Sequence, residues 1–462
     1  MAPEESNPAS SNTKRKATRS ISPPAIKRKA QSSISKSAVN NFFKPTSQKP
    51  KERTSWSERA AHNDTPATLL VGRYEPEDAD EANQKRTKIA AFDFDSTLIT
   101  TASGKKFGDD PNDWKWWDPT VPTKLQHMYA ENYRIIILSN QAGLTLHRDP
   151  KAKGPKNLGR VENFKQKCNA VLAQLDIPIS VYAATGHDIY RKPRIGMWKE
   201  LCKDYDIKEA EIDRENSLFV GDAGGRTAQL KQNSNSFKAV AAKDFSCSDR
   251  NFAHNLEVAY KTPEEFFLGK EPREFLRDFD VAQHPYADDD DGIIFEKKND
   301  KDVVLFCGPP GAGKSTFFWR HLKPLGYERV NQDTLKSRAK CFKAAADHLG
   351  EGKSVAIDNT NPDASGRAEW IEFTKKHKIP IRCVWFKTPL ELCQHNDIVR
   401  ALNKPIMNPE AREALPKLAF NGFASRFKEP NKTKEGFQDV LEVEFKFRGT
   451  REEYAIWGRY WT

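Results

Sequence analysis

Several features that define whole classes of proteins are scarce in this sequence. Its 462 residues include seven cysteines, which are scattered without a Cys-x-x-Cys pair. An odd number in that pattern argues against a disulfide framework and a cysteine zinc site, and it favours a reducing compartment. The ten histidines show no His-x-x-x-His spacing, so a histidine-bound metal is not expected either.

Long apolar runs are also missing. The longest are of strand length, such as Ile135 to Leu138, whereas a bilayer span needs about 20 residues. The first residues contain no apolar stretch that would serve as a signal peptide. We therefore expect a soluble, intracellular protein that makes no membrane contact.

Positive charge is abundant but local. The net charge is +11, and residues 1–60 hold 13 Lys and Arg against 4 Asp and Glu. The rest of the chain is nearly balanced, so any nucleic-acid contact there depends on local patches. Together with a mean hydropathy of -0.77, the polar composition of residues 1–85 predicts a disordered basic tail.

The tail carries two short motifs. Two basic clusters, Lys14 to Lys16 and Lys27 to Lys29, are spaced like a bipartite nuclear-import signal and so predict a nuclear protein. The alternative is a solvated basic tail with non-specific DNA affinity. The segment from Val39 to Phe43 resembles a degenerate sliding-clamp-binding box without its usual first Gln, and a plain hydrophobic tether is the alternative.

After the tail, strand-like and helix-like patterns alternate, which is typical of βαβ units. The first series of strand patterns is at residues 89–92, 134–138, 181–184, 217–220 and 239–242, and the second is at 303–307, 354–357, 381–386 and 442–447. We predict an α/β protein with two doubly wound parallel-sheet domains, at residues 86–275 and 299–462. Residues 276–298, with four consecutive aspartates, are the expected linker.

The strand pattern at residues 89–92 ends in Asp-x-Asp-x-Thr. Residues two apart on a strand face the same way, so Asp93 and Asp95 are both expected at the carboxyl edge of the sheet, where ligands bind. The pair suits a nucleophilic carboxylate that forms an aspartyl-phosphate and a second carboxyl group that gives and takes a proton. The alternative interpretation is that the two aspartates bind a metal or cap a helix.

Three further polar residues follow later strand patterns. Ser139 offers a hydroxyl, Lys192 a cation and Asp222 another carboxylate, which together suit a phosphate and Mg²⁺. With these four motifs in order, residues 88–270 resemble the haloacid dehalogenase superfamily of phosphatases. The resemblance implies that Asp93 is the nucleophile, that Asp95 is the acid and base, and that Mg²⁺ is held by Asp93, Asp222 and the backbone of Asp95.

The tryptophan-rich run from Asp113 to Trp117 follows this first motif. Interleaved aromatics and a cation suit stacking on an unpaired base. Aromatic residues near a strand end are more often core residues, and we favour that interpretation here.

The strand pattern at residues 303–307 leads into Gly-x-x-x-x-Gly-Lys-Ser, the phosphate-binding loop that precedes a helix. Its backbone N–H groups surround nucleotide phosphates, Lys314 reaches the β- and γ-phosphates, and Ser315 binds Mg²⁺, so ATP or GTP binding is expected. The predicted nucleotide-binding residues are Gly308, Gly311, Ala312, Gly313, Lys314, Ser315, Thr316 and Asp358.

Three more residues complete the second site. Asp333 is placed to deprotonate a hydroxyl nucleophile, and Asp358 is either a metal-side or an acceptor-side carboxylate. Arg400, on a helix predicted over residues 391–400, is expected to close over the triphosphate.

The order of the two domains resembles the family of polynucleotide kinase 3′-phosphatases. The resemblance covers nearly everything after residue 88 and includes the lysine element at 190–198 and the Asp-Asn-Thr-Asn run that starts at Asp358. It implies a Mg²⁺- and ATP-dependent monomer that processes DNA ends, with Asp333 activating the 5′-hydroxyl and Arg400 in the lid. The same chemistry on RNA ends, or a DNA-end scaffold with inactive sites, are the alternatives.

Two departures from that family are visible. The first 85 residues are too polar for the forkhead-associated domain of the animal enzymes. The phage-type kinases carry an Arg three residues after the catalytic aspartate, whereas this chain has Lys336. A phosphate-facing role is therefore not assigned to Lys336.

Overall fold

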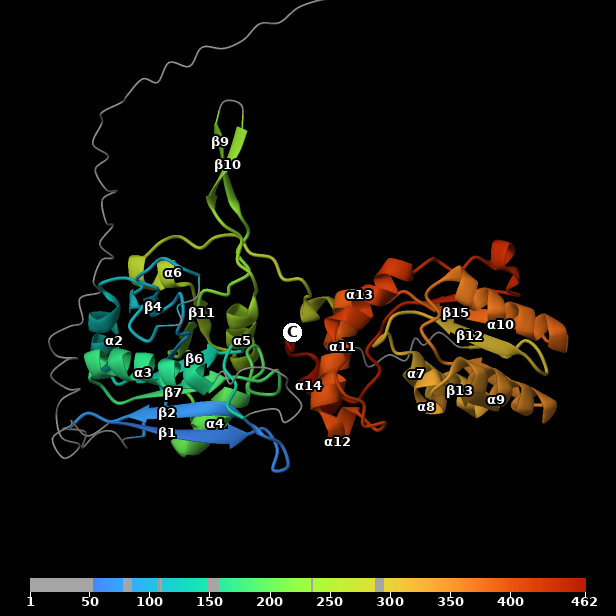
Figure 1. Ribbon diagram of the computed structural model, residues 1–462, viewed down its shortest axis with the longest axis horizontal. Helices are drawn as coiled ribbons and strands as arrows, with labels where there is room; N and C mark the ends of the chain where they lie inside the picture. Colours follow the sequence, from blue (N-terminus) through green and yellow to red (C-terminus); the bar gives the residue numbers. More distant parts are fainter. Residues whose placement is uncertain are drawn as a thin grey trace, which may run out of the picture. The chain divides into compact units, whose positions relative to one another are not determined.

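Two α/β lobes follow one another along the chain. This computed structural model describes residues 53–77, 85–106, 108, 110–147, 158–233, 236–286 and 295–462. We name residues 53–276 the first lobe and residues 295–462 the second lobe. Each is built around a mainly or wholly parallel sheet with helices on both faces (Figure 1), so the predicted fold class is confirmed.

The first lobe contains a seven-stranded sheet in the order β1-β2-β7-β6-β3-β8-β11. Its parallel strands are β3 (Ile89–Phe92), β6 (Arg134–Asn140), β7 (Ile179–Ala184), β8 (Leu218–Val220) and β11 (Ala259–Lys261). The antiparallel hairpin of β1 (Thr54–Ala60) and β2 (Ala67–Tyr74) adds to the β7 side. β3 is the middle one of the five parallel strands, and Asp93 follows its carboxyl end.

Alternate residues of β3 pack into two separate cores. Ala90 and Phe92 join the core that includes α2 (Val121–Ala130) and α3 (Leu158–Leu175). Ile89 and Ala91 join the core that includes α4 (Gly196–Asp204) and α5 (Ser248–Leu256). Because successive strand residues face opposite sides, a continuous apolar run is required where both faces are covered.

The structure corrects the predicted tail boundary. Residues 1–85 were expected to be disordered, but β1 and β2 form an antiparallel hairpin whose Leu69 and Leu70 are fully buried. The hairpin lies at a sheet edge, and its strand β1 is polar and faces solvent. The sequence of β1 therefore shows no clear alternation of apolar and polar residues that would predict a strand. The nuclear-import clusters and the segment from Val39 to Phe43 lie outside the described residues.

A second correction concerns the strand expected at residues 239–242. β10 (Ser236–Ala241) pairs with β9 (Gln229–Asn233) in a separate two-stranded hairpin, which projects from the lobe in Figure 1, and it does not join the main sheet. β11 takes the edge position beside β8 instead.

The tryptophan-rich run packs into the lobe. β5 (Lys115–Trp116) pairs with β4 (Ile99–Thr100), and Trp117 lies 5.9 Å from Phe267 between ring centroids. Trp114, Trp116 and Trp117 are partly buried against the α2–α3 core. These aromatics pack against the core of the lobe, as the favoured interpretation predicts, and each keeps part of its surface exposed.

The second lobe contains a five-stranded parallel sheet in the order β13-β14-β12-β15-β16. Its strands are β12 (Val303–Cys307), β13 (Tyr327–Val330), β14 (Ser354–Ile357), β15 (Ile381–Phe386) and β16 (Val440–Val443). Val303 and Leu305 of β12 pack with α9 (Arg338–Gly350) and α10 (Ala364–His377). Val304 and Phe306 pack with α7 (Lys314–Phe317), η4 (Phe318–Leu322) and α13 (Lys417–Arg426).

The boundary between linker and second lobe also needs correction. Phe295, which was placed in the linker at 276–298, is 4% exposed and belongs to the same core as Phe306. The helix predicted over residues 391–400 is α11 (Leu390–Leu402). The remaining elements are α6 (Pro263–Leu268), α8 (Gln332–Leu335), α12 (Lys404–Met407), α14 (Arg451–Trp457), η2 (Glu209–Glu211), η3 (Val281–Gln283), η5 (Lys323–Leu325) and η6 (Lys432–Gly436).

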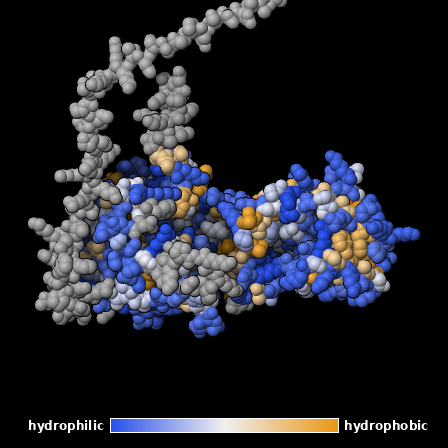
Figure 2. Space-filling view, in the orientation of Figure 1, coloured by the Kyte–Doolittle hydropathy of each residue, from blue (hydrophilic) through white to orange (hydrophobic). Residues whose placement is uncertain are grey.

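All seven cysteines lie in the described part of the chain and carry free thiols. Six are buried, and Cys247 is half-buried. Among the described helices, none is both long and apolar enough to cross a bilayer. The face shown in Figure 2 is largely hydrophilic, with apolar residues in small groups.

Candidate active sites

The first site lies where three parallel strands of the first lobe end. Asp93 follows β3, Ser139 lies near the end of β6, and Asp222 follows β8. The Lys192 ammonium is buried and forms ion pairs with Asp93 Oδ1 at 2.7 Å and with Asp249 Oδ1 at 2.8 Å. The sheet topology therefore brings together residues that are far apart in the sequence.

Asp249, at the start of α5, is the residue that sequence reasoning missed. A carboxylate oxygen from each of Asp93, Asp222 and Asp249 lies within 4.8 Å of the other two. Asp249 also accepts a hydrogen bond from the backbone N–H of Ala223 at 3.1 Å. Gly221 is required beside it, because a Cβ there would lie 2.3 Å from Asp249 Oδ2.

Burial and mutual repulsion perturb these carboxyl groups. Burial, with the charges of Asp93 and Asp249, raises the pKa of Asp222 to about 8. Burial raises the pKa of Asp249 to about 6 and also raises that of Asp93, and Lys192 opposes both shifts. Burial would lower the pKa of Lys192, but the two carboxylates outweigh it and the pKa is raised. Lys192 therefore stays charged and offsets part of the negative charge.

Asp95 and Ser139 are joined by Gln141. Its Nε2 donates to Asp95 Oδ2 at 2.6 Å and to Ser139 Oγ at 3.0 Å. Asp95 is exposed, whereas Asp93 is buried, so the two carboxylates of the Asp-x-Asp pair lie in different surroundings. The Asp95 side chain is not among the three grouped carboxylates.

The second site is a cavity of about 660 Å³ at the carboxyl edge of the five-stranded sheet. The predicted residues that line it are Gly311, Ala312, Gly313, Lys314, Ser315, Thr316, Asp333, Asp358 and Arg400. Gly308 begins the loop but does not line the cavity. The cavity thus brings together the predicted loop residues and three predicted residues from elsewhere in the chain.

The loop from Gly308 to Ser315 is tightly built. Gly311 has a φ of +77°, and a Cβ there would lie 2.3 Å from the carbonyl oxygen of Cys393. The buried Lys314 ammonium donates to the carbonyl oxygens of Gly308 at 3.0 Å and Pro309 at 2.6 Å. Burial lowers the pKa of Lys314, and Asp358 opposes that shift.

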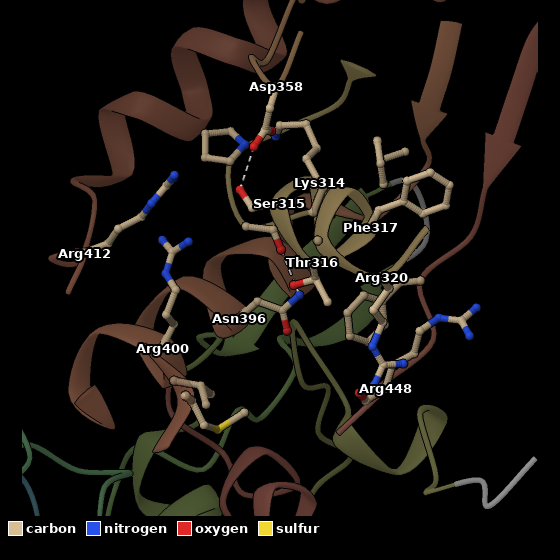
Figure 3. Close-up of a pocket in the computed structure, with 18 of the residues that line it drawn as sticks. Lys314, Ser315, Thr316, Phe317, Arg320, Asp358, Asn396, Arg400, Arg412 and Arg448 are labelled. Carbon is tan, nitrogen blue, oxygen red and sulfur yellow. Dashed lines mark hydrogen bonds between the residues drawn. The ribbon is translucent and has the colours of Figure 1, made fainter. Parts of the chain in front are cut away.

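Asp358 is buried at the end of β14 and faces the loop. Ser315 Oγ donates to Asp358 Oδ2 at 2.9 Å, as Figure 3 shows. Arg329 of β13, which the sequence did not single out, donates to the same carboxylate at 2.7 Å and to Ser315 Oγ at 2.8 Å. Asp358 therefore lies on the serine side of the loop.

Asn331 fixes the position of Asp333. Its Oδ1 accepts from the backbone N–H groups of Asp333 at 2.9 Å and Thr334 at 3.2 Å and so caps α8. Its Nδ2 donates to the carbonyl oxygen of Asp358 at 2.6 Å. One buried side chain thereby ties the aspartate at the cavity rim to the nucleotide side of the sheet.

Arg400 extends from α11 toward the cavity, and Arg412 lies nearby (Figure 3). Arg400 forms an ion pair with Asp397, while its Nε has no hydrogen-bond partner among the described residues. From the same helix, Asn396 donates to the carbonyl oxygen of Gly311 at 2.9 Å. This helix therefore supports the loop and supplies a cation.

Known proteins resemble both lobes of this chain. Residues 88–267 match the family model described as polynucleotide kinase 3 phosphatase, and residues 303–430 match the AAA domain. The bifunctional polynucleotide phosphatase/kinase of Schizosaccharomyces pombe is 37% identical over 388 residues, covering 82% of this chain and 84% of the relative.

The chain belongs to the bifunctional polynucleotide phosphatase/kinase family. A putative bifunctional polynucleotide phosphatase/kinase of Acanthamoeba polyphaga mimivirus is 30% identical over 386 residues, covering 80% of this chain and 88% of the relative. The polynucleotide 3′-phosphatase of Arabidopsis thaliana is 31% identical over 200 residues, covering 41% of this chain and 25% of the relative. The first lobe of this polynucleotide phosphatase/kinase is its phosphatase domain, and the second is its kinase domain.

Mg²⁺ and ATP are the cofactors of this phosphatase/kinase, and its residues fit both. Asp93, Asp222 and Asp249 offer the hard oxygen ligands that Mg²⁺ prefers, within 4.8 Å of one another. In the kinase domain, the glycine-rich loop, Lys314 and Ser315 line a cavity of a size that suits a nucleotide. When bound, Mg²⁺ offsets the charge of a transferring phosphoryl group.

Proposed function

We propose that this enzyme prepares broken DNA ends for ligation by removing a 3′-phosphate and phosphorylating a 5′-hydroxyl. The observation that carries the proposal is that one chain holds both a shielded aspartate paired with Lys192 and a phosphate-binding loop whose cavity includes Asp333. The family's shared domain content supports the pairing of the two activities.

In the phosphatase reaction, Asp93 attacks the phosphorus of the 3′-phosphate and forms an aspartyl-phosphate. Asp95 gives its proton to the departing 3′-oxygen and then takes a proton from the water that hydrolyses the intermediate. Lys192 lies against the nucleophile, where it offsets the negative charge of the phosphoryl oxygens. Gln141 holds Asp95 and Ser139 in position through its two hydrogen bonds.

In the kinase reaction, Asp333 takes the proton of the 5′-hydroxyl, whose oxygen attacks the γ-phosphorus of ATP, and ADP departs. Lys314 and the loop N–H groups hold the phosphates, and Arg400 offsets charge that develops during transfer. Asp358 orients Ser315 through their hydrogen bond.

The finer features of the proposal concern location and partners. The protein acts in the nucleus as a monomer, directed there by the basic clusters at Lys14 to Lys16 and Lys27 to Lys29. The segment from Val39 to Phe43 binds a sliding clamp. The spacing of the two basic clusters, which is typical of a bipartite nuclear-import signal, supports the nuclear location.

The test uses one DNA duplex with a nick that carries a 3′-phosphate and a 5′-hydroxyl, incubated with Mg²⁺ in the presence and absence of ATP. We expect the 3′-phosphate to disappear in both reactions and the 5′-phosphate to form only with ATP. If neither DNA end changes while the matching RNA ends do, the chemistry stands and the DNA assignment is wrong. If neither nucleic acid changes, the scaffold alternative replaces the enzyme.

A further inference from the structure

A chain of ion pairs links the nucleotide side of the kinase cavity to its acceptor side. Arg329, which contacts Asp358, also donates through NH1 to Glu410 Oε1 at 2.7 Å. Arg412 contacts Glu410 through NH2 at 2.7 Å and through Nε at 2.8 Å. The last member of this series of ion pairs is Asp333, whose Oδ2 lies 3.4 Å from Arg412 NH1.

Arg412 is held in one orientation by this arrangement. Two of its nitrogens contact Glu410, and Glu410 is itself anchored by Arg329, which is only 14% exposed at its side chain. Burial would raise the pKa of Glu410, but the two arginines outweigh it and hold the pKa below its usual range. Glu410 is therefore charged at neutral pH and fixes Arg412 with NH1 directed toward Asp333.

Arg412 lines the cavity beside the proposed base. Asp333 is the proposed base for the 5′-hydroxyl, and its carboxylate is 77% exposed at the cavity rim. An acceptor hydroxyl that reaches Asp333 arrives attached to a sugar, and the phosphate on the other side of that sugar follows it. A guanidinium in contact with Asp333 is thus adjacent to the first phosphate of the strand, and a charged, fixed donor suits a phosphate oxygen.

We propose that Arg412 binds the phosphodiester that follows the 5′-terminal nucleoside and so makes the kinase select strands over free nucleosides. Glu410 and Arg329 are positioning residues that orient Arg412 for this contact. The proposal rests on the proposed kinase function. It gives Arg412 a task distinct from that of Arg400, whose ion pair is with Asp397.

Lys336 offers a matched control. It lies close to Asp333 in the sequence, but it is exposed, has a φ of +69° at the end of α8, and does not line the cavity. Loss of its charge removes a nearby cation without removing the contact that the proposal requires.

The experiment combines two protein variants with two acceptor strands. Wild type, Arg412→Gln and Lys336→Gln receive a 5′-hydroxyl strand whose first linkage is either a phosphodiester or an uncharged methylphosphonate. For wild type, we expect the methylphosphonate to raise KM roughly 10- to 100-fold with little change in kcat. Arg412→Gln should raise KM for the phosphodiester by a similar factor and should lose the discrimination between the two strands.

The inhibition constants of strands that lack the 5′-hydroxyl should show the same pattern without turnover. Lys336→Gln should behave as wild type, Arg412→Lys should recover part of the discrimination, and Glu410→Gln should weaken it. If Arg412→Gln discriminates between the two linkages as strongly as wild type, the proposal is overturned. If wild type itself fails to phosphorylate the phosphodiester strand, the proposed kinase function fails first, so the two failures are distinguishable.

Discussion

Asp93, Asp222 and Asp249 share one small volume, and the buried Lys192 ammonium pairs with Asp93 and Asp249. The negative charge that they bring together raises the pKa of Asp222 to about 8 and that of Asp249 to about 6, with burial as the main cause. In such a group, protons and Mg²⁺ compete for the same oxygens. The site is therefore expected to bind its metal in a pH-dependent manner.

The first prediction concerns that pH dependence. A folded-state pKa of about 8 at Asp222, against about 3.9 for an unfolded aspartate, means that the folded chain retains a proton that the unfolded chain releases. The stability due to this proton is present at low pH and is lost as the pH rises through about 4 to 8. Mg²⁺ replaces the proton, so saturating Mg²⁺ should raise the unfolding temperature by about 2–4 °C more at pH 8 than at pH 6.

Thermal unfolding with and without Mg²⁺ at the two pH values measures this difference. Asp222→Asn should remove most of it, because the titrating carboxyl group is gone. Equal Mg²⁺-induced shifts at pH 6 and pH 8 in the wild type would contradict the prediction.

At the scale of single residues, the sequence predicted the site residues that stand within motifs. It did not predict those that join a site only through folding. Asp93, Lys192 and Lys314 stand in recognisable local patterns. Asp249 reaches the phosphatase site because α5 packs beside β8, and Arg412 meets Asp333 across the cavity. No local spacing encodes either contact.

A short element positions Asp333, the proposed base of the kinase domain. α8 has only four residues and carries Asp333 in its first turn, so its direction depends on its cap. Asn331 supplies that cap and also bonds to the end of β14. A helix this short has little stability of its own.

The second prediction tests that dependence. Asn331→Ala removes the cap and the bond to Asp358, so it should lower the free energy of unfolding by about 1–2 kcal/mol. Displacement of Asp333 should reduce the kinase kcat roughly 10- to 100-fold. Urea unfolding and steady-state kinetics measure the two effects.

Asn331→Asp is the comparison, because its carboxylate can still cap the helix, while the bond to the Asp358 carbonyl oxygen is replaced by repulsion between two oxygens. It should retain more activity than Asn331→Ala. If both variants match wild type in kcat, Asn331 does not position the base.

At the scale of elements, the sequence predicted the central strands well and the edges poorly. β3, β12, β14 and β15 match their predicted ranges because continuous apolar runs mark strands that are covered on both faces. The β1–β2 hairpin lies at an edge and is half polar, so its pattern resembled that of the tail. The separate pairing of β10 depends on a partner strand that no local signal identifies.

The two activities belong to separate sheets with separate residues. The phosphatase residues follow strands of the seven-stranded sheet, and the kinase residues follow strands of the five-stranded sheet. Single substitutions should therefore separate the two reactions within one chain.

The third prediction is that separation. Asp93→Asn should reduce 3′-phosphate removal at least ~10³-fold, because an amide is a poor nucleophile, and it should leave 5′-phosphorylation unchanged within about twofold. Lys314→Ala should have the reverse effect. Both activities are measured on the same nicked duplex, and loss of both from either single change would refute two independent sites.

The buried cysteines also have a practical consequence. Burial raises the pKa of all seven thiols, including Cys247 and Cys307 to about 11, so little reactive thiolate is present at neutral pH. A cysteine introduced at an exposed position beside the acceptor site, as in Glu413→Cys, should react with a maleimide dye well before the native thiols. The natural chain is therefore a ready background for fluorescence recordings of segment motion during single turnovers.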